Sequence, residues 1–442
     1  MKRALTTFVV TILAAVMVSC SGYGSSSTNP NGQSTSGFGF RAFVSNPLQP
    51  TGGGNVPVLN IVDAAKDSFT GFSAQLSGTS TFPGLLALTA NLKNTLVFSS
   101  TGNTITVVDN ASEAIAQSGT TPLPALPLLG PTESMAIWID DATVFVAEPG
   151  APMTGRSTGA VEVFSFLTGS TVPEAVLPVA SARYLVESHD GNRLLVFSDS
   201  PQNPADSPPE CPTPQCITLI SPSQIGSSTD PRTAISSPSF DHPVGAVFSS
   251  DDSLAYVFNC GPQCGGATAS IAVLDFSQTP PAVTSTIPVP AATRGILSGT
   301  TLYVAGTPPG VSCPSGSPAT TCGELTVVDT GSGTASASFT INAGYHDRVV
   351  MGANGQLFVG ASSMCDNCLS IFNTATAKVV LPPDAGLVTG IQPITDRGVV
   401  YVCSGGHLRV YDTTTDQLQA QQVVIVGDAI DVKLVDPPGN FN

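Results

Sequence analysis

Short apolar strands separated by polar turns recur along most of this chain. Apolar and polar residues alternate over runs of about five to seven positions, clusters of Gly, Asp, Asn and Ser interrupt these runs, and no helical period persists. Two copies of the pattern read TLYVAG…LTVVDTGSG from Thr301 to Gly333 and VVYVCSGGHLRVYDTTTDQ from Val399 to Gln417. Repeats at a spacing of roughly 40–60 residues are typical of β-propellers, because one blade alone cannot bury both of its faces. The pattern therefore predicts an all-β propeller.

Eight copies of the second strand of a blade can be identified. They begin near Arg41, Thr95, Thr143, Arg193, Leu254, Thr301, Gln356 and Val399. The third strand follows each of them, and five third strands end in an aspartate: Asp63, Asp109, Asp275, Asp329 and Asp412. An aspartate at this position can accept backbone N–H bonds in the following turn, so we assign these five carboxylates a structural role.

The two ends of the repeat region predict how the ring closes. The region starts with a second strand, RAFVSN, and ends with an unpartnered first strand at residues 429–435. Placing the C-terminal strand in the N-terminal blade pairs both open edges. We therefore expect one propeller of eight four-stranded blades over residues 40–437, followed by a tail at 438–442. Seven blades is the alternative if residues 184–239 do not form a full blade.

The N-terminus has the character of an export signal. Two basic residues precede an apolar stretch that is too short to span a bilayer comfortably and that ends in Met-Val-Ser-Cys20. This ending resembles the lipobox of bacterial lipoproteins, although methionine stands where leucine is commonest. The resemblance implies a signal peptide at 1–19 and a lipidated Cys20, and Ser21 favours the outer membrane. An ordinary signal peptide with an incidental cysteine is the alternative.

Residues 20–39 and the overall charge add to this picture. The segment after Cys20 is rich in Ser, Gly and Asn, so we expect a flexible tether that holds the propeller off the membrane. The whole chain has 15 Lys and Arg against 31 Asp and Glu, a net charge of −16. Such a charge disfavours nucleic acid as a partner.

The repeats of residues 40–437, with the character hYVxxxxxxxhxVhDTxT, resemble the YVTN-type β-propeller repeats of bacterial surface and periplasmic proteins. That group grades into propeller lactonases and quinoprotein-like propellers. The resemblance implies an envelope protein, lipid-anchored and facing the periplasm or the cell surface. It specifies the fold and leaves the activity open, because propellers serve enzymes, binding proteins and scaffolds alike.

Four close pairs of cysteines follow Cys20, each in or beside the loop between the second and third strands of a blade. The pairs belong to four consecutive blades: Cys211 and Cys216, Cys260 and Cys264, Cys313 and Cys322, Cys365 and Cys368. In an exported protein we expect local disulfides that stiffen these loops on one rim. The Cys365-Asp-Asn-Cys368 spacing also fits half a zinc site or a redox motif. Cys403 lies within a strand and is expected to be a buried free thiol.

A set of basic residues maps to the same rim. Aligned first strands place three arginines at one equivalent position, with three histidines nearby: Arg183, Arg294, Arg348, His242, His346 and His407. Three arginines around a channel mouth could clamp a carboxylate, a phosphate or a sulfated sugar by forked hydrogen bonds. The alternative is local ion pairing, for which Glu133, Asp241 and Asp347 are available.

Motifs for catalysis are absent from the sequence. It contains no H-E-x-x-H, P-loop, EF-hand loop or haem C-x-x-C-H, so we assign no catalytic residue and no cofactor. Calcium or zinc at the rim remains an alternative. We expect a non-catalytic binding scaffold for an unknown protein, a glycan or a small anion. Two other classes stay open: a lactonase-like hydrolase at the channel mouth, and an accessory lipoprotein of an envelope assembly.

Overall fold

The structure is a computed structural model that describes residues 35–48, 56–76, 83–100, 102–198, 211, 215–311, 313, 322–383 and 386–437. The expected signal peptide at 1–19, Cys20, most of the tether and the tail at 438–442 lie outside these residues. Among the described residues, no helix has the length and apolar character needed to cross a membrane.

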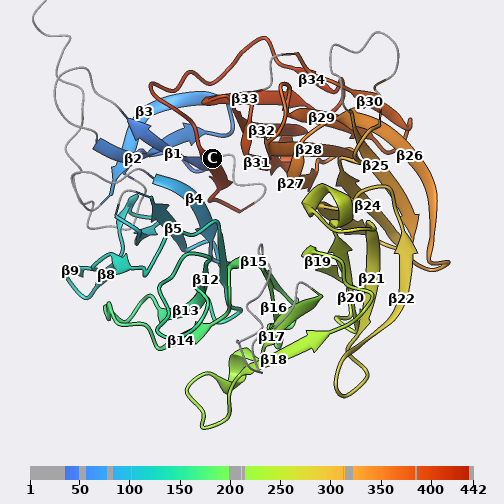
Figure 1. Ribbon diagram of the computed structural model, residues 1–442. Coiled ribbons are helices and arrows are strands. Elements are labelled where there is room, and N and C mark those ends of the chain that lie inside the picture. The colour runs from blue at the N-terminus through green and yellow to red at the C-terminus, as the bar shows by residue number, and fades with distance from the viewer. Residues whose placement is uncertain are drawn as a thin grey trace, which may run out of the picture.

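Eight antiparallel sheets surround a central axis, as Figure 1 shows. We number the blades 1 to 8 from the N-terminus. The inner strands of blades 1 to 8 are β35 (Asp431–Leu434), β4 (Pro83–Leu88), β11 (Ser134–Ile137), β15 (Ala182–Glu187), β19 (Pro243–Phe248), β23 (Arg294–Ser298), β27 (Tyr345–Met351) and β31 (Val388–Ile394). Each inner strand contacts the next around the complete ring.

The second and third strands are the apolar pairs that the repeats predict. The second strands are β1 (Arg41–Leu48), β5 (Asn94–Ser99), β12 (Thr143–Glu148), β16 (Leu194–Ser198), β20 (Leu254–Asn259), β24 (Thr301–Gly306), β28 (Gln356–Ser363) and β32 (Val399–Ser404). The third strands are β2 (Val56–Asp63), β6 (Thr104–Asp109), β13 (Ala160–Ser165), β17 (Cys216–Ile220), β21 (Ser270–Asp275), β25 (Cys322–Asp329), β29 (Leu369–Asn373) and β33 (His407–Asp412).

The outer strands are shorter or more exposed. They are β3 (Ser68–Gln75), β7 (Ala114–Ile115) with β10 (Leu126–Pro127), β14 (Ala175–Pro178), β18 (Arg232–Ser236), β22 (Ala282–Pro288), β26 (Thr334–Asn342), β30 (Lys378–Val380) and β34 (Gln417–Leu418). The remaining elements are a small hairpin, β8 (Gln117–Ser118) and β9 (Thr121–Pro122), and three 3₁₀ turns, η1 (Pro222–Gln224), η2 (Gly261–Cys264) and η3 (Thr395–Arg397).

The prediction of eight blades is confirmed, and β15, β16, β17 and β18 form a complete fourth blade, so the alternative of seven blades is wrong. The reason lies in how the strands alternate. In β12, Val144 and Val146 pack toward blade 2, whereas Phe145 and Ala147 pack toward blade 4. An apolar cluster of this kind lies between every two adjacent blades of the described structure. Each middle strand is therefore apolar on both faces.

The five aspartates that end third strands have the structural role that we assigned to them. Each accepts a backbone N–H from the turn that follows it, as Asp412 Oδ1 does from Thr414 at 2.8 Å and from Thr415 at 2.9 Å. These bonds satisfy turn amides that have no partner in the strand ladder.

Ring closure follows the predicted scheme, because the C-terminal β35 pairs with β1 in blade 1. A buried ion network surrounds this junction. The Arg41 guanidinium donates from Nε and Nη2 to the two Asp436 carboxylate oxygens at 2.8 and 2.7 Å, and from Nη1 to Glu113 Oε1 at 2.7 Å. Asp436 follows β35, and Glu113 belongs to blade 2. One side chain therefore joins the first strand, the last strand and the next blade.

Replacing Arg41 by alanine should lower the free energy of unfolding by about 3–5 kcal/mol, because it leaves two buried carboxylates without their cation. Denaturant unfolding of purified protein measures this loss. Lys66→Ala is the matched control: its side chain is 75% exposed next to Asp63, so it should cost less than about 1 kcal/mol. Equal losses in the two variants would show that the network does not secure the closure.

Candidate functional site

The three rim arginines lie on the inner strands of three blades, near the ends at which these strands begin. Arg183 is in β15, Arg294 is the first residue of β23, and Arg348 is in β27. We call this end of the propeller the upper rim, and the loops between second and third strands emerge there too, since adjacent strands are antiparallel. The arginines lie close enough to influence one another's surroundings. The charge of Arg348 adds to burial in lowering the pKa of Arg294, and the charge of Arg183 partly offsets the rise that burial causes in the pKa of Tyr184.

Two of the arginines have carboxylate partners. Arg183 Nε donates to Glu133 Oε2 at 2.9 Å, and its guanidinium lies 5.2 Å from the centre of the Tyr184 ring. Arg348 Nη1 donates to Asp347 Oδ2 at 3.1 Å, and Asp347 also accepts from Ser362 at 2.8 Å. For these two residues, the local pairing that the sequence left open is present.

Arg294 differs from both. It is half-buried, and within the described chain no carboxylate lies at ion-pair distance from its guanidinium. Burial, and then the charge of Arg348, lower the pKa of Arg294 from its usual value of 12.5. Gly245 on the adjacent β19 leaves room beside it, since a Cβ there would lie 3.7 Å from Arg294 Nη1. The channel mouth thus holds a cation that has no ion-pair partner among the described residues, and Asp347 acts on it only through its charge.

A pair of tyrosines, which the sequence analysis missed, completes this group. Tyr184 and Tyr345 influence each other through their side chains, although the residues belong to β15 of blade 4 and β27 of blade 7. The side chains therefore reach across the channel mouth, and burial raises the pKa of Tyr184. Their positions next to Arg183 and close to Arg348 in the first strands were the available signal.

The three predicted histidines do not join the arginines. His346 is 1% exposed and its Nε2–H donates to the Asn342 carbonyl at 2.9 Å. His242 Nδ1 lies 2.9 Å from Asp241 Oδ1, and the same carboxylate accepts two backbone N–H groups of the loop in blade 5. His407 is exposed at the start of β33.

The four cysteine pairs lie at disulfide-bonding distance, with S–S separations from 1.97 to 2.06 Å. All four lie between the second and third strands of blades 4 to 7, as predicted. Cys403 is the buried free thiol that we expected, and burial raises its pKa.

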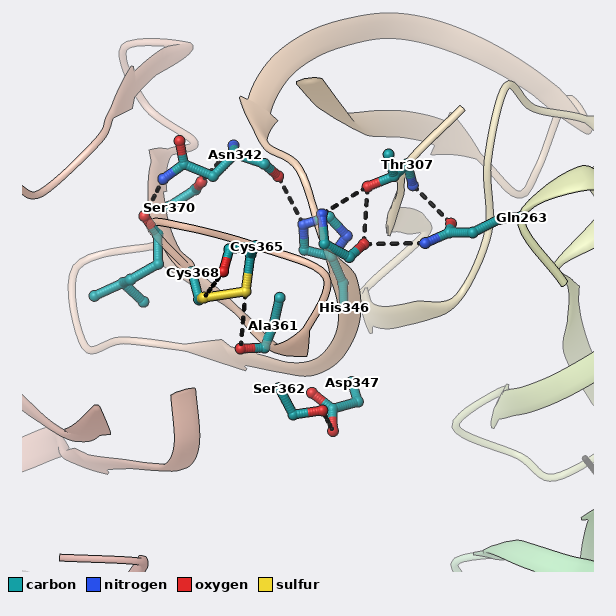
Figure 2. The surroundings of a disulfide bond; sticks show 12 residues. Gln263, Thr307, Asn342, His346, Asp347, Ala361, Ser362, Cys365, Cys368 and Ser370 are labelled. Atoms are coloured by element: carbon teal, nitrogen blue, oxygen red, sulfur yellow. Dashed lines mark hydrogen bonds between the residues drawn. A yellow bond between two sulfur atoms is a disulfide. The ribbon is translucent and has the colours of Figure 1, made fainter. Parts of the chain in front are cut away.

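Three of these loops surround a pocket of about 320 Å³ on the upper rim. Its lining includes Pro262 and Gln263 of blade 5, Thr307 and Pro308 of blade 6, and Met364 of blade 7. Figure 2 shows Gln263 and Thr307 next to His346 and the Cys365–Cys368 disulfide. Gln263 Nε2 and Thr307 Oγ1 both donate to the Gly344 carbonyl, at 3.0 and 2.8 Å, and the Thr307 N–H donates to Gln263 Oε1 at 2.8 Å. These bonds tie the three blades together at the pocket.

A buried carboxyl pair in blade 3 is among the other groups with a shifted pKa. Burial and a hydrogen bond with Glu162 raise the pKa of Glu148 to about 9. Both residues are at most 2% exposed, and the Gly130 N–H donates to Glu148 at 2.5 Å. A substrate cannot reach this carboxyl pair in the described conformation, so we assign it to the interior of blade 3. Among the described residues, no three His, Cys, Asp or Glu side chains gather as metal ligands would.

The fold defines a class of protein, the eight-bladed β-propellers. No protein-family model matches the chain, and no curated protein matches its sequence significantly. Solved structures do resemble it. The dihydro-haem d1 dehydrogenase NirN has 12% identity and a TM-score of 0.57, over 95% of this chain and 78% of that one. Kuenenia stuttgartiensis hydrazine synthase has 12% identity and a TM-score of 0.52, over 78% and 96%.

The Pseudomonas aeruginosa periplasmic gluconolactonase PpgL is also similar, with 14% identity and a TM-score of 0.51 over 89% of this chain and 98% of that one. At these identities the likeness shows the fold alone.

His346 should make stability depend on pH. Burial lowers its pKa to about 4, so between the ordinary value of 6.5 and pH 4 the unfolded chain binds a proton that the folded chain does not. This contribution to stability is therefore present above pH 6.5 and is lost as the pH falls toward 4, by about 3 kcal/mol.

Urea unfolding between pH 4 and 7 measures this effect. His346→Gln, which can still donate to Asn342, should flatten the pH dependence relative to the wild type. His407→Gln, an exposed histidine, should leave it unchanged. An unchanged slope in His346→Gln would contradict the burial-shifted pKa.

Proposed function

We propose that this protein is a lipid-anchored propeller of the bacterial envelope that acts as a non-catalytic binding protein and holds a small anion at its channel mouth. The observation that carries the proposal is Arg294, a half-buried guanidinium at the upper rim with no carboxylate partner in the described chain. A desolvated cation is costly unless an anion accompanies it, and the forked guanidinium matches a carboxylate or phosphate group.

The surrounding groups favour the same ligand chemistry. The Tyr184 and Tyr345 hydroxyls lie in the electrostatic reach of Arg294, and a hydroxyl can donate a hydrogen bond to an anion. Arg348 is held by Asp347 at the edge of the same group, where it adds positive potential.

Binding is favoured over hydrolysis because two of the three predicted rim histidines, His346 and His242, are held by local contacts. His346 is buried with a pKa of about 4, and His242 is bonded to Asp241. The Glu148–Glu162 pair is closed to solvent. A general base must lie within hydrogen-bond reach of the proton that it abstracts, and none of these groups meets that condition in the described conformation.

The envelope location rests on the lipobox-like ending at Cys20 and on four cysteine pairs placed for disulfides, which persist in oxidising compartments. Elution of the purified protein as a monomer in size-exclusion chromatography would favour a stand-alone binding protein. Co-purifying envelope proteins would favour an accessory subunit of an assembly.

Arg294→Ala should weaken the binding of acetate, phosphate or sulfate by at least about tenfold, because a charge-assisted hydrogen bond in a desolvated site contributes about 1.5–3 kcal/mol. Titration calorimetry against each anion measures the change. Arg294→Lys keeps the charge but loses the fork and should fall between the wild type and Arg294→Ala.

The control for net charge is Lys378→Ala on the outer strand β30 of blade 7, which should bind as the wild type does. If alanine at Arg183, Arg294 and Arg348 together left every anion's affinity unchanged, the proposed site would be wrong. Turnover of a lactone that depends on Arg294 would replace the binding role by a hydrolytic one.

A further inference from the structure

The channel mouth and the rim pocket are joined by two chain segments. Arg294 pairs with Ala305 in β24, and two residues further along the chain Thr307 lines the pocket. Two residues of extended chain span about 7 Å. On the other side, Ala343 and Gly344 line the pocket and directly precede Tyr345. A ligand of modest length could therefore contact both places at once.

The pocket presents an apolar surface. Pro262, Pro308 and Pro309 contribute rings, and Met364 is 66% exposed at its edge. The polar groups of Gln263 and Thr307 are occupied by each other and by the Gly344 carbonyl. Since little hydrogen-bonding capacity remains, the pocket suits an apolar group rather than a sugar or a second charge.

The loops around the pocket are constrained before any ligand arrives. Pro262 and Gln263 lie between Cys260 and Cys264, and Met364 adjoins Cys365 of another disulfide. Proline rings and cross-links reduce the entropy that binding would otherwise cost. Pre-organisation of this kind is expected of a ligand site more than of a passive surface.

The charges at the mouth set the ligand's charge. Among the described residues, three arginines and two carboxylates, Glu133 and Asp347, interact there, which leaves one net positive charge within this set. One charge is balanced by a monoanion such as a carboxylate, whereas a phosphate dianion would leave an excess negative charge in a half-buried site.

We propose that the ligand is a monocarboxylate with an apolar chain, whose carboxylate binds Arg294 and whose chain lies in the rim pocket. This inference rests on the proposed anion site and adds the substituent that the anion carries. A medium-chain fatty acid has this chemistry and serves as the probe.

Calorimetric titration of the full-length protein with acetate, butyrate, hexanoate and octanoate tests the inference. Affinity should rise along the series by up to about fourfold for each methylene that becomes buried. Met364→Ser should reduce this rise and leave acetate binding unchanged, whereas Arg294→Ala should weaken every member. Val424→Ser, which replaces a 76% exposed valine of blade 8, is the matched control and should bind as the wild type does.

The outcomes separate the two proposals. Equal affinities for acetate and octanoate, both dependent on Arg294, would overturn the apolar chain and keep the anion site. A rise with chain length that is insensitive to Arg294→Ala would overturn the anion site itself. A rise that Met364→Ser and Ala343→Phe both leave unchanged would overturn the rim pocket as the place of the chain. No octanoate binding at millimolar concentration would overturn the apolar chain, and it would overturn the anion site as well if acetate, phosphate and sulfate also failed to bind.

Discussion

Closure of the ring by β35 is the constraint on which the remaining geometry depends. A propeller blade has one edge on the axis, and blade 1 obtains its inner edge only when the last strand of the chain pairs with β1. Arg41 then binds Asp436 just beyond β35 and Glu113 of blade 2, so that the junction is held by charge as well as by strand pairing. With the ring closed at eight blades, the width of the channel is determined, and so is the distance across which inner-strand side chains can meet.

The proposed site depends on two tyrosines whose side chains come close to each other across a channel of this width. Tyr184 and Tyr345 come from blades 4 and 7, and the inner strands between them carry Gly245 and Gly295 near the upper rim. A Cβ at Gly295 would lie 2.8 Å from the Phe258 ring, so the backbone there packs closely against its neighbour. Gly245 on β19 lies beside the Arg294 guanidinium, since a Cβ there would be 3.7 Å from Arg294 Nη1. The whole chain is strongly acidic, so an anion reaches this cation through local geometry rather than through long-range attraction.

Much of the fold could be predicted from the sequence, because a blade strand that packs on both faces is an apolar run that can be recognised along the chain. The same is true of the aspartates that end third strands, whose partners are two or three residues away. The site was harder. The sequence alignment placed His346 at the rim, yet the strand pairing is irregular on both sides of it. Its side chain is buried, and its Nε2–H donates a hydrogen bond to the Asn342 carbonyl. The interaction between Tyr184 and Tyr345 involves residues more than 150 positions apart, and it depends on the number of blades, which no local pattern contains.

The distribution of cross-links argues that one half of the ring carries the function. Disulfides occur in blades 4 to 7, and the three rim arginines come from blades 4, 6 and 7. In blade 8 the corresponding connection is the two-glycine turn Gly405–Gly406, which needs no cross-link because both residues adopt positive φ. If the disulfides served only the stability of the fold, they would bring equal benefit to any blade with a long loop. Their confinement to the side of the ring that carries Arg294 fits loops held rigid around a ligand, where pre-organisation lowers the entropic cost of binding.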